Sequence, residues 1–318
     1  PVSTSARLED AVNTASGIID VTSGAGMYAL GGRDEITRVI NNGEISVLGG
    51  MGMVASGKNA EAVNTSSDFK IKTSTGGFYA HNGGKVINSA DLTVNSSGVS
   101  LFNIDVNSEG SSVGNIIMDG TNSVAVYNKG KFTSTGDIDI AKSGSIAVYS
   151  TGTDNTNIKA DTIKLDGAKG AAFYTDGGKI NISPNTGTTT AVTVSGDSSY
   201  LFYDSSFKTG AVPNQTFVID GNFTANVKDG AIAFDFKNNS GNLIDYVKNS
   251  LLNIKSGTTT INIEGTAFHA KNSTISIDEV SQIKTTGGLA SGSVILKGSD
   301  IFYAEESNLL LFGESKVS

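Results

Sequence analysis

A strand–turn–strand motif recurs along this chain at intervals of 22 to 34 residues, and this repetition constrains the fold more than any other feature. In one copy, the apolar run Ala171–Thr175 and the run Lys179–Ile182 flank a turn at Gly177 and Gly178. Repetition at such a period is typical of a solenoid, in which each repeat packs only on its neighbours. Aligning the copies gives one column of mostly large apolar residues: Met27, Met53, Phe78, Phe102, Val126, Val148, Phe173, Phe202, Phe234, Phe268 and Phe302.

Each repeat holds three short apolar runs separated by turns. In the copy at Val126 these runs are Ala125–Tyr127, Lys131–Phe132 and Ile138–Ile140. The alternation in Ile138-Asp139-Ile140 is the pattern of a half-buried strand. Three strands and three turns predict one coil of a parallel β-helix, and parallel crossovers are overwhelmingly right-handed. The eleven anchor residues therefore predict an all-β, right-handed parallel β-helix of about eleven coils over residues 1–318, as a single segment.

The later coils are longer than the early ones. The segment 237–252 contains Leu243, Ile244, Val247 and Leu251, whose spacing matches one face of a helix. We therefore expect a short helix in that insertion. Loops on a rigid scaffold are where binding residues concentrate. The insertions lie near 204–216, 237–252 and 282–292.

Composition argues against several classes of partner. The net charge is −8 and no cluster of Lys or Arg occurs, whereas nucleic acid and anionic membranes attract cationic surfaces. The absence of cysteine excludes a disulfide framework and thiolate metal sites. No apolar run reaches the roughly 18 residues that indicate a transmembrane helix. We expect a monomer with no cofactor or metal site, no nucleic-acid partner and no direct insertion of this segment into a membrane.

Two pairs of motifs resemble a known family. Gly26–Ala29 is followed by Ile40–Ile45, and Ala172–Tyr174 is followed by Gly178–Ile180. In these motifs, and in their repetition along nearly the whole chain, the sequence resembles the passenger domain of the large fusobacterial type V autotransporter adhesins. The resemblance implies a β-helix on the bacterial surface that adheres to host cells and other bacteria. It also implies attachment to the outer membrane through a translocator, or secretion. Because the chain starts at Pro1 and both ends lie in mid-pattern, we expect a fragment of a longer passenger.

A second column follows the apolar one by one residue and is expected to face outward. It permits two interpretations. An exposed aromatic stripe would suit stacking on sugars or contact with a protein receptor. Alternatively, successive tyrosines stack on each other and stabilise the coil. The column consists of Tyr28, Val54, Tyr79, Asn103, Tyr127, Tyr149, Tyr174, Tyr203, Asp235, His269 and Tyr303.

The candidate receptor-binding residues come from this column and from the second insertion. The receptor is expected to be a glycan or a protein on host or bacterial cells. A structural stalk that only spaces other parts of an adhesin is the first alternative. The candidate residues are Tyr127, Tyr149, Tyr174, Tyr203, Tyr246 and His269.

A polysaccharide-degrading β-helix enzyme is the second alternative, and the sequence argues against it. Asp235 beside His269 has the composition of an oriented general base, but no nucleophile is positioned with them. Asp137 and Asp139 are the best carboxylate pair, yet their neighbours in the next coil are Thr162 and Lys164, so no acidic cluster builds up. We therefore predict no catalytic residues.

Overall fold

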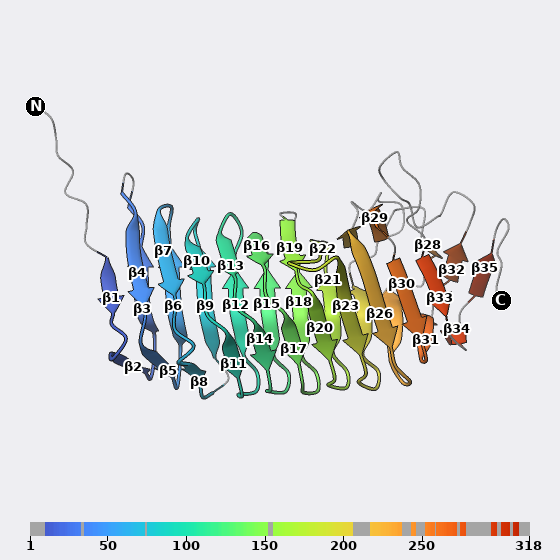
Figure 1. Cartoon of the computed structure of the whole chain (residues 1–318), viewed down its shortest axis with the longest axis horizontal. Helices are drawn as coiled ribbons and strands as arrows, with labels where there is room; N and C mark the ends of the chain where they lie inside the picture. The colour runs from blue at the N-terminus through green and yellow to red at the C-terminus, as the bar shows by residue number, and fades with distance from the viewer. Residues whose placement is uncertain are drawn as a thin grey trace, which may run out of the picture.

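The chain winds into an elongated solenoid in which strands stack along the long axis, with β1 at one end and β35 at the other (Figure 1). Every regular element in the described part of the chain is a β-strand, and all strand pairs within the sheets run parallel. The expected all-β parallel β-helix is thereby confirmed. The computed structural model describes residues 10–32, 35–73, 75–151, 155–205, 217–236, 243–245, 252–257, 259–271, 274–277, 294–297, 300–305 and 308–311.

Three long sheets form the sides of the solenoid. The eleven-stranded sheet contains β3 (Ala25–Leu30), β6 (Met51–Ser56), β9 (Gly76–His81), β12 (Ser100–Ile104), β15 (Val124–Asn128), β18 (Ile146–Ser150), β21 (Ala171–Thr175), β24 (Tyr200–Asp204), β27 (Ile232–Phe236), β31 (Thr266–Lys271) and β34 (Asp300–Glu305). The ten-stranded sheet contains β1 (Ala11–Asn13), β4 (Thr37–Asn41), β7 (Ala60–Asn64), β10 (Lys85–Asn88), β13 (Glu109–Ser112), β16 (Lys131–Ser134), β19 (Asn155–Lys159), β22 (Lys179–Ser183), β25 (Phe217–Asp220) and β29 (Leu252–Ser256). The eight-stranded sheet contains β11 (Leu92–Val94), β14 (Ile116–Met118), β17 (Ile138–Ile140), β20 (Thr162–Leu165), β23 (Thr189–Val194), β26 (Asn222–Val227), β30 (Thr259–Ile263) and β33 (Val294–Lys297).

Two three-stranded sheets complete the ends. One contains β2 (Ile18–Val21), β5 (Glu44–Val47) and β8 (Phe69–Ile71), and the other contains β28 (Leu243–Asp245), β32 (Thr274–Ile277) and β35 (Asn308–Leu311). The expected count of eleven coils is corrected accordingly. Eleven strands stack in the largest sheet, but only seven consecutive turns, from β9–β10–β11 to β27–β29–β30, place a strand in each of the three long sheets.

From Met27 to Phe234, the apolar column predicted from the repeat is buried and forms the central row of the core. Its members are Cα partners at every step from Met27 to Phe302. Within it, the rings of Phe78 and Phe102 stack with centroids 4.8 Å apart, and Phe69 stacks on Phe78 at 4.6 Å. Full burial of one such side chain stabilises the fold by roughly 1.5–3 kcal/mol. The core is therefore a continuous stack along the axis.

The turns use the residues that tolerate a left-handed backbone. Between β9 and β10, Asn82 and Gly83 have φ values of 53° and 87°, and before β18 Gly144 has a φ of 71°. A β-branched residue would be strained at such a φ, whereas Gly and Asn adopt it readily. Lys169 and Ser198 adopt the same backbone in later turns, with φ values of 57° and 55°.

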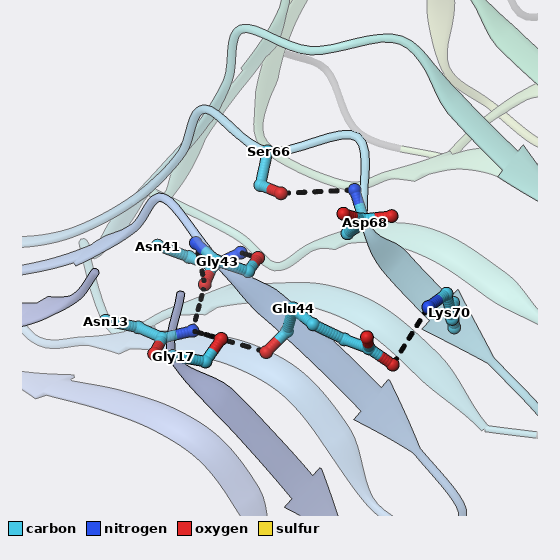
Figure 2. A network of polar contacts seen from close by, with 8 residues as sticks. All are labelled: Asn13, Gly17, Asn41, Gly43, Glu44, Ser66, Asp68 and Lys70. Atoms are coloured by element: carbon cyan, nitrogen blue, oxygen red, sulfur yellow. Dashed lines mark hydrogen bonds and ion pairs between the residues drawn. The ribbon is translucent and has the colours of Figure 1, made fainter. Parts of the chain in front are cut away.

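A buried ladder of asparagine amides runs along one inner corner, and the sequence analysis did not foresee it. Asn13 Nδ2 donates to Asn41 Oδ1 at 2.7 Å, Asn41 Nδ2 to Asn64 Oδ1 at 2.8 Å, and Asn64 Nδ2 to Asn88 Oδ1 at 2.8 Å. Asn88 Nδ2 then donates to Ser112 Oγ at 3.1 Å. Figure 2 shows the first rung beside exposed polar contacts of the same corner. Because buried amides need partners, the ladder fixes the register of these turns.

The predicted helix in the insertion 237–252 is wrong for its described residues. Leu243–Asp245 forms β28, which pairs in parallel with Thr274–Ile277. A neighbouring strand satisfies the backbone groups there, so the local helical spacing is overridden. Residues 237–242 and 246–251 lie outside the described residues, as do 206–216 of the first insertion and all of 282–292.

Candidate functional site

The second column lies on the outer side of the eleven-stranded sheet, in the predicted register. Consecutive members are Cα partners from Tyr28 to Tyr303. Its exposure is uneven, contrary to the expectation of a uniformly outward stripe. Tyr28 is 49% exposed, whereas Val54 and Asp235 are 4% and 7% exposed.

Four tyrosines of the column form one stack of rings, here called the tyrosine stack: Tyr127, Tyr149, Tyr174 and Tyr203. The rings of Tyr149 and Tyr174 are nearly parallel, with an interplanar angle of 5° and centroids 4.3 Å apart. Tyr127 meets Tyr149 edge-to-face at 5.0 Å, and Tyr203 meets Tyr174 edge-to-face at 4.7 Å. Each such pair contributes roughly 0.5–1.5 kcal/mol beyond the burial of its area. The geometry supports the interpretation that these rings stabilise successive coils.

The hydroxyls of the tyrosine stack act as neutral hydrogen-bonding groups. Burial, followed by the proximity of Tyr174, strongly raises the pKa of Tyr149. Burial, followed by the carboxylate of Asp235, likewise raises the pKa of Tyr203. The hydroxyl of Tyr174 donates to Ser205 Oγ at 3.1 Å. Because burial favours the protonated phenols of Tyr149 and Tyr203, these two residues add no charge to the surface at neutral pH.

The buried carboxylate of Asp235 is held by a further tyrosine. Tyr200 is hydrogen-bonded to Asp235, and its pKa is raised by burial and then by that carboxylate. The register places His269 next to Asp235 and Tyr303 next to His269, as the sequence predicted. The remaining candidate, Tyr246, lies outside the described residues. The Asp235 carboxylate therefore anchors the last coils of the stack region.

The tyrosine column is interrupted at Asn103, and a mixed surface surrounds the interruption. We call the group Tyr79, His81, Asn103, Tyr127 and Lys129 the Asn103 patch. The ring of Tyr79 stacks on that of His81 at 4.7 Å and 11°, and Lys129 Nζ lies 5.3 Å from the centre of the Tyr127 ring. Sequence reasoning missed His81 and Lys129. Both stand two residues after the column: His81 ends β9 on the face that carries Tyr79, and Lys129 lies in the bend directly after β15.

The carboxylates of Asp137 and Asp139, the best candidate pair for catalysis, make contacts with the next coil. Asp137 Oδ1 accepts hydrogen bonds from the backbone N–H of Thr162 at 2.8 Å and of Asp161 at 3.1 Å. Asp139 pairs with Lys164 in register, as predicted, and burial raises the pKa of its carboxyl group while Lys164 opposes the shift.

Among the described residues, no three His, Asp or Glu side chains gather closely enough to hold a metal ion. No helix in that part of the chain has the length and apolarity needed to cross a membrane.

Asp161 is held by the turn of the next coil. Its carboxylate accepts hydrogen bonds from the backbone N–H of Asn185 at 2.9 Å and of Gly187 at 3.0 Å, and from both the backbone and the hydroxyl of Thr186. The hydroxyl of Thr186, followed by the backbone N–H of Gly187, lowers the pKa of Asp161 to about 2. The carboxylate therefore orders the exposed turn 185–187.

This turn is expected to loosen in acid. The pKa of Asp161 lies below the roughly 3.9 of a free Asp, so its contribution is present above about pH 4 and is lost as the pH falls towards 2. The hydrogen-exchange protection factors of the amides of 185–187 should fall over that interval, and Asp161→Asn should show low protection already at pH 7. An NMR titration of the Asp161 carboxyl carbon with a midpoint near that of a free Asp would contradict this expectation.

No family model, curated protein or solved structure matches this chain. Its function is therefore inferred from the residues and their geometry.

Proposed function

We propose that this chain is a segment of a bacterial surface adhesin that binds a glycan or protein receptor on host or bacterial cells. The Asn103 patch is the observation that carries the proposal. It combines two aromatic rings, an amide and an imidazole on adjacent strands of one sheet with an ammonium group from the bend after β15. Such amphipathic groups on a rigid scaffold suit recognition. The resemblance to fusobacterial passengers supports a surface location, with outer-membrane anchoring through a separate translocator, or secretion.

The patch is better suited to binding than the tyrosine stack. In the stack, Tyr149 and Tyr174 cover each other face to face. In the patch, Tyr79 and Tyr127 are two coils apart with only Asn103 between them, so their rings do not close on one another. Strands are spaced by roughly 4.8 Å, so the two rings stand about 10 Å apart along the axis. The patch, together with the insertions after β24 and β27, is the proposed contact region.

A structural spacer is the second candidate function. The observation that favours it is the connection between successive coils through the tyrosine stack and the asparagine ladder, which both strengthen the rod. A polysaccharide-degrading enzyme ranks last, because the best carboxylate pair is divided between a backbone contact at Asp137 and a register partner, Lys164, at Asp139. We propose a monomeric, non-enzymatic protein.

Binding of the purified chain to host and bacterial cells tests the proposal, with soluble sugars as competitors. We expect saturable binding that the double variant Tyr79→Ser/Tyr127→Ser weakens about tenfold or more, because aromatic anchors dominate interfaces and both rings are half-exposed. Ile117→Ser is the matched control. Ile117 is 40% exposed in β14 of the eight-stranded sheet, away from the patch, and its replacement should leave binding unchanged.

The other outcomes separate the alternatives. Saturable binding that is insensitive to the patch variant would exclude the patch and move recognition to the insertions. Absence of binding by a folded chain would contradict adhesion by this segment and leave the spacer. Circular dichroism of each variant verifies that the β-helix is intact.

A further inference from the structure

We propose that Tyr149 and Tyr174 form a site of oxidative cross-linking, at which a one-electron oxidant of the peroxidase class joins the two rings covalently. The residues are Cα partners on β18 and β21. Among the tyrosine ring pairs of the described residues, theirs has the shortest centroid distance, 4.3 Å, and the smallest interplanar angle, 5°. This inference is independent of the proposed adhesive function.

The orientation of the two rings brings the reactive carbons together. Both side chains leave equivalent positions of in-register parallel strands, so the rings point in the same direction. Rings that leave the sheet in the same direction, nearly parallel and with centroids 4.3 Å apart, bring the Cε carbons of one phenol close to the other phenol. These ortho carbons carry much of the unpaired electron of a phenoxyl radical.

The reaction balances with hydrogen peroxide as the terminal oxidant. Oxidation of each phenol removes one electron and one proton and leaves a phenoxyl radical. The two radicals couple by forming one Cε–Cε bond, and each joined carbon then loses its hydrogen as a proton while its ring oxygen gains one. Two electrons and two protons leave the protein in total, and they reduce one molecule of hydrogen peroxide to two of water. The hydrogen bond from Tyr174 to Ser205 Oγ gives a first acceptor for the departing proton.

The neighbouring pairs are not arranged for the same coupling. Tyr127 with Tyr149 and Tyr174 with Tyr203 meet at 62° and 73°, so the edge of one ring faces the plane of the other. Preorganised reactants at short distance react as if at a very high concentration, which selects the parallel pair. The product would close a loop of 25 residues between consecutive coils. A cross-link of this kind restricts the unfolded chain and raises resistance to unfolding.

The experiment treats the folded full chain with a haem peroxidase and limiting hydrogen peroxide. We expect dityrosine fluorescence in a product that remains monomeric on a denaturing gel. Trypsin should then release the peptides 143–159 and 170–179 joined together, lighter by two hydrogens than their sum. Tyr149→Phe retains the ring and should abolish this product, whereas the matched control Tyr127→Phe should retain it.

The proposal fails if Tyr149→Phe gives the same fluorescence as the parent chain, or if the joined peptides contain other tyrosines. Covalent dimers as the sole product would also overturn it, because they would show coupling between molecules. Oxidation of the urea-unfolded chain completes the test. The joined peptides should disappear there, and an equal yield would show that the folded geometry is not the cause.

Discussion

Replacing Phe102 by alanine is expected to lower the free energy of unfolding by about 3–5 kcal/mol. Phe102 is fully buried at 0% exposure, stacks on Phe78 at 4.8 Å and contacts the ring of Phe132 at 5.3 Å. Alanine removes one ring from the centre of this stack and leaves a cavity, because the coils on both sides are held at the strand spacing by their backbone hydrogen bonds. We expect few single substitutions in this chain to lower the free energy of unfolding by more than this.

Two controls separate the cavity from a general effect of mutation at this coil. Phe102→Leu keeps most of the volume and should cost less than about 1.5 kcal/mol. Val106 is 55% exposed in the following turn, so Val106→Ala should stay within about 0.5 kcal/mol of the parent. Chemical denaturation followed by circular dichroism gives the values, and hydrogen exchange in β12 and β15 shows where protection is lost. Equal costs for Phe102→Ala and Val106→Ala would refute the packing argument.

Replacing Asn64 by alanine is expected to lower the free energy of unfolding by about 3 kcal/mol. The reason is that Asn41 and Asn88, its partners on the two sides of the ladder, each lose a hydrogen bond in a buried site. Asn64 Oδ1 accepts from Asn41, and its Nδ2 donates to Asn88 and to the carbonyl oxygen of Ser66, each at 2.8 Å. Each buried group left without its partner carries a desolvation penalty of about 1–3 kcal/mol.

Ser134 offers a matched control in the same inner column. The register links Asn88 to Ser112 and Ser112 to Ser134. The hydroxyl of Ser134 is buried and has no hydrogen-bond partner in the described part of the chain. Ser134→Ala should therefore be neutral, or stabilise the fold by up to about 1 kcal/mol. A large decrease in the free energy of unfolding for Ser134→Ala, or a small decrease for Asn64→Ala, would show that the hydrogen bonds of this column do not determine the stability of the fold.

The two columns along the eleven-stranded sheet were predictable to the residue. Each copy of the motif offers one large apolar anchor, and the turns around it use Gly and Asn, so alignment of the anchors fixes the register. The pairings of Phe202 with Phe234 and of Asp235 with His269 hold even across the longer coils. Repetition supplies the long-range information that a single strand lacks.

The remainder depends on contacts that the repeat does not encode. Asn41 stands in the segment Asn41-Asn42-Gly43, which has the composition of a turn, and only the fold shows that its amide is buried. Leu243 and Ile244 have a helix-compatible spacing, yet pairing with a distant strand decides their conformation. For the tyrosines, the sequence left stacking and exposure open, because ring angles are set by local packing. The interruption of the tyrosine column at Asn103 could be recognised as a candidate binding surface only once the structure placed His81 beside Tyr79 and Lys129 beside Tyr127.

The amides of the asparagine ladder share one direction, since every Nδ2 from Asn13 to Asn88 donates towards the later coil. A half-turn of the Asn41 or the Asn64 amide would set nitrogen against nitrogen on one side and oxygen against oxygen on the other. Asn41, Asn64 and Asn88 also donate to carbonyl oxygens of their own turns. The amides therefore keep one shared orientation, and their aligned dipoles polarise one another. Order at the first coil is in this way transmitted to the fourth, although each strand is bonded only to its immediate neighbours.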